Sequence, residues 1–214
     1  MRVQKTAFYL FVAWLLCACG QKPPPTTPVS TIKADTIYAE TDTTEAEDTL
    51  KKEIQKTLFE KFLPDGYTLL QEARGDINQD GFEDAVLVLK SIEADSLWSD
   101  AARPLLLLVG DDGGNFKISA RNDSVVLCCG CGGVFGDPFE GISINDNYFS
   151  VEHYGGSSWR WARKAVFRYD ARLNDWFLYK TEGISYHTSN PDSTTQTVNT
   201  ADDFGQISFH TYRY

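Results

Sequence analysis

A short acidic loop that runs directly into an apolar segment constrains this fold more than any other stretch. The stretch Gly75–Leu89 reads GDINQDGFEDAVLVL, so polar turn residues give way without a spacer to a run typical of a buried β-strand. Side-chain oxygens alternate along the loop, and Gly81 stands where a backbone turns around a small cation. The pattern predicts a structural calcium site at a hairpin tip, with the candidate ligands Asp76, Asn78, Asp80, Phe82 and Asp84.

The loop is not an EF-hand. Position twelve, where an EF-hand has a bidentate Glu, is Leu87 and already belongs to the apolar run. The alternative to a metal site is a turn rich in Asn, Asp and Gly that binds no ion, because these residues favour turn geometry by themselves.

The form DxNxDGxxD followed by an apolar strand resembles the FG-GAP or VCBS-type loops of integrin-like and secreted bacterial proteins. This resemblance implies a loop that joins two antiparallel strands. The segments RPLLLLVGDDGGNF, VFGDPFEG and HYGGSSWRW carry a looser resemblance to uncharacterised bacterial envelope lipoproteins with one such loop, which implies no known activity. The chain holds one full copy of the motif, so we expect hairpins like those of a propeller blade without a complete propeller.

The N-terminus predicts a lipoprotein signal peptide over residues 1–18. Two basic residues precede the apolar run Ala7–Leu16, which is too short to span a bilayer. The following LCAC resembles a bacterial lipobox with Cys19 as the lipid acceptor, and acyl chains such as palmitate on Cys19 would anchor the chain in a bilayer. A plain secretory signal peptide is the alternative. Under the enterobacterial sorting rule, Gly20 in place of Asp favours the outer membrane, with either face open.

Residues 19–43 are expected to form a tether, because they are rich in Pro and Thr and poor in bulky apolar residues. Residues 44–214 then form a single globular β-rich domain, which is long enough to bury its own core. The chain has 30 acidic and 20 basic residues and a net charge of −10. This acidity disfavours nucleic acid as a partner. The sequence does not indicate an oligomeric state.

The domain is predicted to be mainly β, of the α+β class, with an antiparallel meander and one N-terminal amphipathic helix. A capping box opens the helix at Thr44, apolar residues recur every four positions to Phe62, and Pro64 ends it. Short polar turns separate the following strands, and Gly110–Asn115 is one such hairpin turn. Ser189–Asp203 is too polar for a core and is expected to be a mobile loop. The expected strands are Tyr67–Ala73, Ala85–Leu89, Pro104–Val109, Phe116–Ala120, Val125–Leu127, Ile142–Ile144, Tyr148–His153, Trp159–Tyr169, Trp176–Tyr186 and Ile207–Tyr212.

Three cysteines lie in the glycine-rich segment CCGCGG, and Cys128 and Cys131 have C-x-x-C spacing. An oxidising envelope favours a structural disulfide, which leaves one of Cys128, Cys129 and Cys131 outside the bond. A redox dithiol and half of a zinc site are the alternatives. The redox alternative lacks the helix that follows a thioredoxin-type motif, and the zinc alternative lacks a second half-site.

The segment His153–Tyr169 is the densest aromatic and basic stretch of an otherwise acidic chain. Strand alternation predicts an aromatic face with both tryptophans and a basic face opposite. Such a strand would stack sugar rings or bind a peptide or an anionic glycan. The alternative, which we favour from the pattern, is a Trp face in the core and an Arg face in salt bridges. The candidate ligand-binding residues are His153, Tyr154, Trp159, Arg160, Trp161 and Arg163.

The sequence favours binding over catalysis, because it contains no G-x-S-x-G, H-E-x-x-H or P-loop motif. We expect an outer-membrane lipoprotein with a structural calcium loop that binds an envelope glycan or protein. One alternative is an envelope enzyme, either a thiol-disulfide protein that uses the C-x-x-C motif or a hydrolase that pairs His153 with Asp137 or Glu140. A purely structural envelope component is the other alternative.

Overall fold

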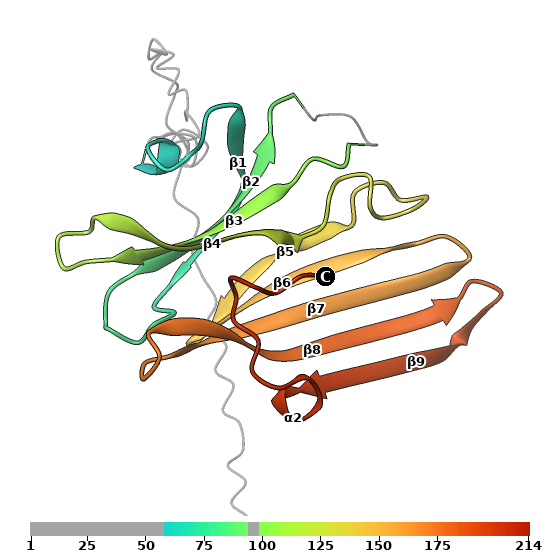
Figure 1. The fold of residues 1–214 in the computed structure, drawn as a ribbon. Helices are drawn as coiled ribbons and strands as arrows, with labels where there is room; N and C mark the ends of the chain where they lie inside the picture. Colours follow the sequence, from blue (N-terminus) through green and yellow to red (C-terminus); the bar gives the residue numbers. More distant parts are fainter. Residues whose placement is uncertain (1–57, 94–98) are drawn as a thin grey trace, which may run out of the picture. The chain divides into compact units, whose positions relative to one another are not determined.

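Apolar strands that alternate with short polar turns form two antiparallel sheets (Figure 1). The computed structural model describes residues 58–93 and 99–214. In both sheets each strand pairs with its neighbours in the chain, in the orders β1-β2-β3-β4 and β5-β6-β7-β8-β9. The fold is therefore mainly β and antiparallel, as the sequence predicts, and the described strands form two sheets instead of propeller blades.

The first sheet consists of β1 (Tyr67–Gly75), β2 (Asp84–Ser91), β3 (Arg103–Gly110) and β4 (Phe116–Val126). The second sheet consists of β5 (Phe139–Asn145), β6 (Tyr148–Gly156), β7 (Trp159–Asp170), β8 (Asp175–His187) and β9 (Asn190–Thr200), and the short helix α2 (Ala201–Phe204) follows. The predicted segments Phe116–Ala120 and Val125–Leu127 are parts of one strand, β4. Register shifts in its pairing with β3 interrupt the alternation from which strands are recognised.

Two further expectations are wrong. The segment Ser189–Asp203 forms β9 and α2 instead of a mobile loop. All residues of β9 are exposed, so backbone pairing with β8 holds it in place and its sequence has no apolar alternation to indicate a strand. The segment Ile207–Tyr212 was expected to be a strand, but it makes only an isolated bridge, between Phe177 and Ser208. Its aromatic rings are buried individually and do not follow a pleat.

The central strands of the first sheet are buried on both faces. Val86 and Leu105 face the second sheet and belong to the main core, whereas Leu87 and Leu106 face the opposite side and pack with Phe59. Phe59 lies in a helical turn, residues 58–60, just before Pro64. This turn is the described end of the predicted helix, and its burial agrees with core packing.

The remainder of the predicted helix, the predicted signal peptide with Cys19 after it, and the predicted tether lie outside the described residues. No helix within residues 58–93 and 99–214 is long and apolar enough to cross a membrane.

The C-terminal segment (residues 205–214) fills the space beside the second sheet, and one buried amide holds it there. Phe209 packs edge-on against Phe149 and Phe167, at ring-centroid distances of 5.7 and 5.4 Å. Asn122 of β4 donates hydrogen bonds from Nδ2 to the carbonyls of Phe209 and Tyr212. Its Oδ1 accepts from the backbone N–H of residues 124 and 125. Asn122 is 4% exposed, so water does not compete for these bonds.

Replacing this amide tests its role. Asn122→Ala is expected to lower the free energy of unfolding by about 2–4 kcal/mol, because it leaves buried carbonyl and N–H groups without partners. Urea denaturation measures this change. Asn145→Ala, at an exposed position, is the matched control and should change stability by less than about 0.5 kcal/mol. Equal effects of the two substitutions would contradict the role of Asn122.

Candidate functional site

The strand β7 lies only half over the core. Ala165 and Phe167 are fully buried in its second half, whereas Trp159 at its start is 62% exposed and Trp161 is partly buried. The expectation that the Trp face belongs to the core therefore holds for Ala165 and Phe167 and is wrong for Trp159. The ring of His187 on the paired strand β8 contacts Trp159 edge-on at 5.2 Å.

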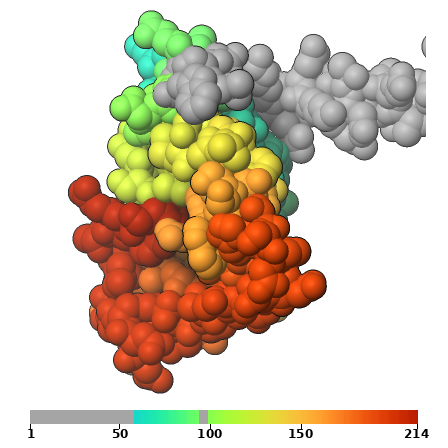
Figure 2. Space-filling view, turned by 90° about the vertical axis from the view of Figure 1, so that its right-hand side faces the viewer, coloured from blue at the N-terminus to red at the C-terminus, as the bar shows by residue number. Residues whose placement is uncertain are grey.

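A groove of about 310 Å³ lies further along the second sheet, and Arg163 is the residue of the same β7 face that lines it. We call it the β7–β9 groove. Cross-strand register brings Arg163, Gly183 and Thr197 side by side on β7, β8 and β9, and Tyr212 and Tyr214 of the C-terminal segment also line the groove. Figure 2 shows a hollow between the C-terminal segment, in dark red, and the orange strands.

Gly183 keeps the groove open. A Cβ atom at this position would lie 2.6 Å from Oγ1 of Thr197, closer than van der Waals contact allows. A larger residue would therefore displace the Thr197 side chain, which lines the groove.

Two arginines of the groove, Arg163 and Arg213, form no salt bridge within the described part of the chain. The guanidinium of Arg163 lies 5.3 Å from the ring centroid of Trp161, a cation–π contact. Nearby carboxylates have other partners, since Glu152 pairs with Lys164 on the opposite face of the sheet at 2.7 Å. The groove therefore carries positive charge that the protein does not neutralise itself.

His153 lies next to the groove and is neutral at physiological pH. It is 1% exposed, its Nε2 accepts a hydrogen bond from the backbone N–H of Leu127 at 3.1 Å, and its ring contacts Tyr214 edge-on at 4.6 Å. No described residue offers a partner to its Nδ1. Burial lowers the pKa of His153 to about 4, and the nearby charges of Arg103 and Arg163 act in the same direction.

The remaining predicted residues of this stretch lie on the opposite face of the sheet. Arg160 stacks over the ring of Phe135 at 4.1 Å, and the hydroxyls of Tyr154 and Tyr186 are 3.1 Å apart. The structure thus brings His153, Trp161 and Arg163 together at the groove and separates Tyr154 and Arg160 from them.

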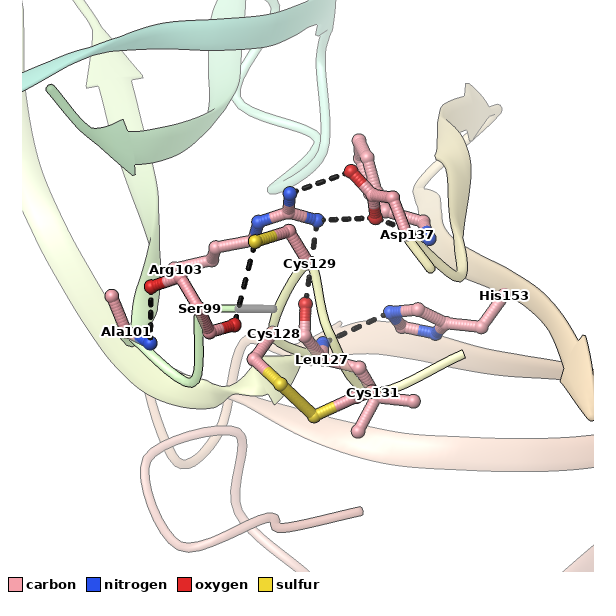
Figure 3. The surroundings of a disulfide bond; sticks show 10 residues. Ser99, Ala101, Arg103, Leu127, Cys128, Cys129, Cys131, Asp137 and His153 are labelled. Carbon is pink, nitrogen blue, oxygen red and sulfur yellow. Dashed lines mark hydrogen bonds and ion pairs between the residues drawn. A yellow bond between two sulfur atoms is a disulfide. The ribbon is translucent and has the colours of Figure 1, made fainter. Parts of the chain in front are cut away.

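The cysteine loop is braced from both sheets (Figure 3). A disulfide joins Cys128 to Cys131, and Cys129 Sγ, outside this bond, donates to the carbonyl of Ser99. Arg103 of β3 forms a bidentate ion pair with Asp137 at 2.7 and 2.6 Å. Burial alone would raise the pKa of Asp137, but the hydrogen bonds from Arg103 and from the Phe139 N–H hold it below its usual value.

Glycines let this loop pack directly on the β6 backbone. Gly156 N–H donates to the Gly132 carbonyl, Val134 N–H donates to the Gly156 carbonyl, and Cζ2 of Trp161 lies 2.7 Å from where a Cβ at Gly155 would be. The glycine pair Gly155-Gly156 therefore leaves room for the loop and the indole ring. No cluster of three or more His, Cys, Asp and Glu side chains suited to a metal occurs among the described residues.

The predicted calcium loop lies at the tip of the β1–β2 hairpin. Asp76 accepts hydrogen bonds from the N–H groups of Asp80 and Gly81, Asn78 Oδ1 also accepts from Asp80, and Asp80 Oδ1 accepts from Phe82. Gly81 has a φ of 89°, which disfavours any side chain there.

Asp84 at the end of this loop is buried. Its carboxylate accepts from the N–H groups of Ile77, Asn78 and Gly110, and it thereby ties the loop to β3. Burial raises the pKa of this carboxyl.

The groove residues Gly183, Thr197, Tyr212 and Tyr214 were not predicted as site residues. They come from strands and a segment far apart in the sequence, and no local motif marks them. One sequence feature could have indicated Gly183. It is the lone glycine of β8, and a glycine within a strand indicates that another group approaches the backbone closely.

No protein-family model matches this chain, and no curated protein matches it. Among solved structures, the chain is similar to a Xanthomonas type IV secretion system related protein, with a TM-score of 0.36 and 15% sequence identity over 71% of this chain. The match covers 62% of that structure, so the chain spans about three fifths of its length. A likeness this distant carries no inference about function.

The lowered pKa of His153 predicts acid sensitivity. His binds a proton near pH 6.5 in the unfolded chain but only near pH 4 in the folded protein, so the stability it contributes is present above pH 6.5 and lost as pH falls towards 4. Between pH 7 and pH 5 the free energy of unfolding should fall by about 2 kcal/mol through this residue. Urea denaturation at both pH values measures it.

His153→Gln is the control, because it lacks the histidine and keeps every carboxylate. The carboxylates therefore contribute equally to the pH dependence of both proteins. The variant should lose less stability than the wild type between pH 7 and pH 5. Identical pH profiles for the two proteins would contradict the assignment.

Proposed function

We propose that this chain is a lipid-anchored outer-membrane protein whose globular domain binds an envelope glycan or protein in the β7–β9 groove. One observation carries the proposal: β7 continues past the core with its aromatic face uncovered. Trp159 is 62% exposed, and Arg163 on the same face has no ion-pair partner among the described residues. An exposed indole and an unpaired guanidinium beside a groove are suited to ligand recognition.

The anchor is proposed from the sequence alone. The lipobox-like segment with Cys19 and the Pro- and Thr-rich tether over residues 19–43 support it. An extended tether of this composition would hold the domain away from the lipid headgroups, where a groove can meet ligands of the envelope.

We also propose that the β1–β2 loop binds calcium. A carboxylate has about four acceptor positions, so Asp76 and Asp80 retain oxygens beyond their backbone hydrogen bonds. Asn78 and the Phe82 carbonyl add neutral oxygens, and Asp84 has accepted three N–H groups and retains about one position. Oxygen donors of this kind suit a hard cation, and binding would draw together acidic side chains that form no metal-binding cluster in this structure. Calcium would supply the charge that balances these carboxylates, while the chain holds the hairpin tip in shape.

No observation favours the enzyme alternatives over binding. Asp137 is engaged by Arg103, and His153 has no hydrogen bond to Asp137 or Glu140 among the described residues. The Cys128–Cys131 bond lies in a loop braced from two sheets, a setting suited to a structural disulfide.

Trp159 provides the test of the binding surface. Trp159→Ala is expected to weaken binding to envelope glycans at least about tenfold, because it removes an aromatic stacking surface. The melting temperature should change little, because the side chain is largely exposed. A glycan array followed by titration of the bound glycan measures the affinity.

Tyr179→Ala is the matched control, since Tyr179 is 42% exposed and packs against Tyr148, away from Trp159. It should bind like the wild type. The proposal fails for glycans if the wild type binds none of them, and the aromatic start of β7 is not part of the site if Trp159→Ala binds as tightly as Tyr179→Ala.

Chelation tests the calcium site. For an affinity of about 0.1 mM, 1 mM calcium should stabilise the fold by about 1.4 kcal/mol, so a chelator should lower the melting temperature. Asp80→Asn should abolish most of this difference in scanning calorimetry. Asp111→Asn, in the turn between β3 and β4, alters a similar exposed carboxylate and should retain the difference. A wild-type melting curve that is the same with calcium and with chelator rules the site out.

A further inference from the structure

The β7–β9 groove combines positive charge with neutral hydrogen-bonding groups. Arg163 and Arg213 supply the charge. The hydroxyls of Thr181 and Thr197 and the amide of Asn199 supply donors and acceptors along the same surface. The Asn199 amide donates to Thr181 Oγ1 at 3.3 Å, which leaves the hydroxyl hydrogen of Thr181 available as a donor.

The positive charge of the groove contrasts with the acidic average of the chain, which has a net charge of −10. Several other cations pair with nearby acids, as Arg121 does with Asp123 and Arg172 does with Asp170, and others stack on aromatic rings, as Arg160 does on Phe135. In the groove, Glu182 pairs with Lys180 at 2.5 Å and is not available to either arginine. An anion bound here would meet two guanidinium groups that form no salt bridge with a described carboxylate, in a groove whose one acidic side chain, Glu182, pairs with Lys180.

The shape and polarity of the groove distinguish between classes of anion. An extended peptide uses backbone pairing or apolar pockets, whereas the Thr, Asn and Arg side chains of this groove offer hydrogen bonds and charge beside its tyrosines. The half-buried Trp161 stacks with Arg163, and the exposed Trp159 follows on the same face of β7. Aromatic faces stack on the apolar faces of sugar rings.

We propose that the β7–β9 groove binds an acidic glycan, a polysaccharide that carries carboxylates on its sugar rings. Arg163 and Arg213 bind the carboxylates, Thr181, Thr197 and Asn199 bind ring hydroxyls, and the tryptophans stack on the sugar. This ligand class rests on the proposed binding function of the same groove.

Affinity electrophoresis of the purified protein tests the ligand class. Native gels contain polygalacturonate, alginate or hyaluronate, and matched gels contain the same polysaccharides with their carboxyls reduced to alcohols. At least one acidic polysaccharide should retard the protein, and its reduced form should bind at least about tenfold more weakly, as expected for the loss of charge-assisted hydrogen bonds.

Two variants test the residues. Arg163→Gln and Arg213→Gln should each weaken the retardation about 10- to 100-fold. Arg172→Gln makes the same charge change in the β7–β8 turn, where Arg172 is 88% exposed, and should bind like the wild type. Melting curves confirm that all three variants are folded.

Four results would overturn the inference. Equal binding of acidic and reduced polysaccharides would mean that the groove recognises the neutral part of the sugars. That result would still agree with the proposed binding function. Equal retardation by polyglutamate would mean that the groove binds acidic peptides. Absence of retardation in every acidic gel, or weakening no greater in Arg163→Gln and Arg213→Gln than in Arg172→Gln, would remove the acidic-glycan site altogether.

Discussion

The groove depends on one buried amide. Asn122 on β4 binds two carbonyls of the C-terminal segment and so fixes Phe209 against Phe149 and Phe167. Without this attachment the segment would have few backbone partners, because it pairs with the second sheet mainly near Ser208. Tyr212 and Tyr214, which line the groove, follow directly from that attachment. A core interaction therefore shapes a surface site.

The same strand serves the core and the site. Ala165 and Phe167 anchor β7 in the core, and the rigid pleat carries Arg163, Trp161 and Trp159 outwards in fixed alternation. The disulfide loop braces this extension through backbone contacts to Gly156. Binding residues on a braced strand lose little conformational freedom when a ligand binds, which favours affinity. The exposed indole is thus positioned by packing that lies several residues away.

Sequence patterns predicted most of the fold because most strands bury one or both faces. They missed β9, since its threonines are exposed and only backbone pairing with β8 specifies the strand. They also predicted a strand at Ile207–Tyr212. Aromatic rings of that segment are buried, but its backbone does not form a pleated strand. For the site, Trp161 and Arg163 were predicted from alternation. Gly183 and Tyr214 were not, because only the tertiary fold brings them to the groove.

The central claim is that ligand binds at the aromatic end of β7 and along the groove beside it. Nuclear magnetic resonance of the tryptophan indole N–H groups, recorded during titration with an oligomer of galacturonate, tests this claim most directly. The account predicts shifts for Trp159 and Trp161 and an unchanged signal for Trp176, which is 2% exposed in the core. Unchanged signals for Trp159 and Trp161 at saturating ligand, or a shift confined to Trp176, would contradict it.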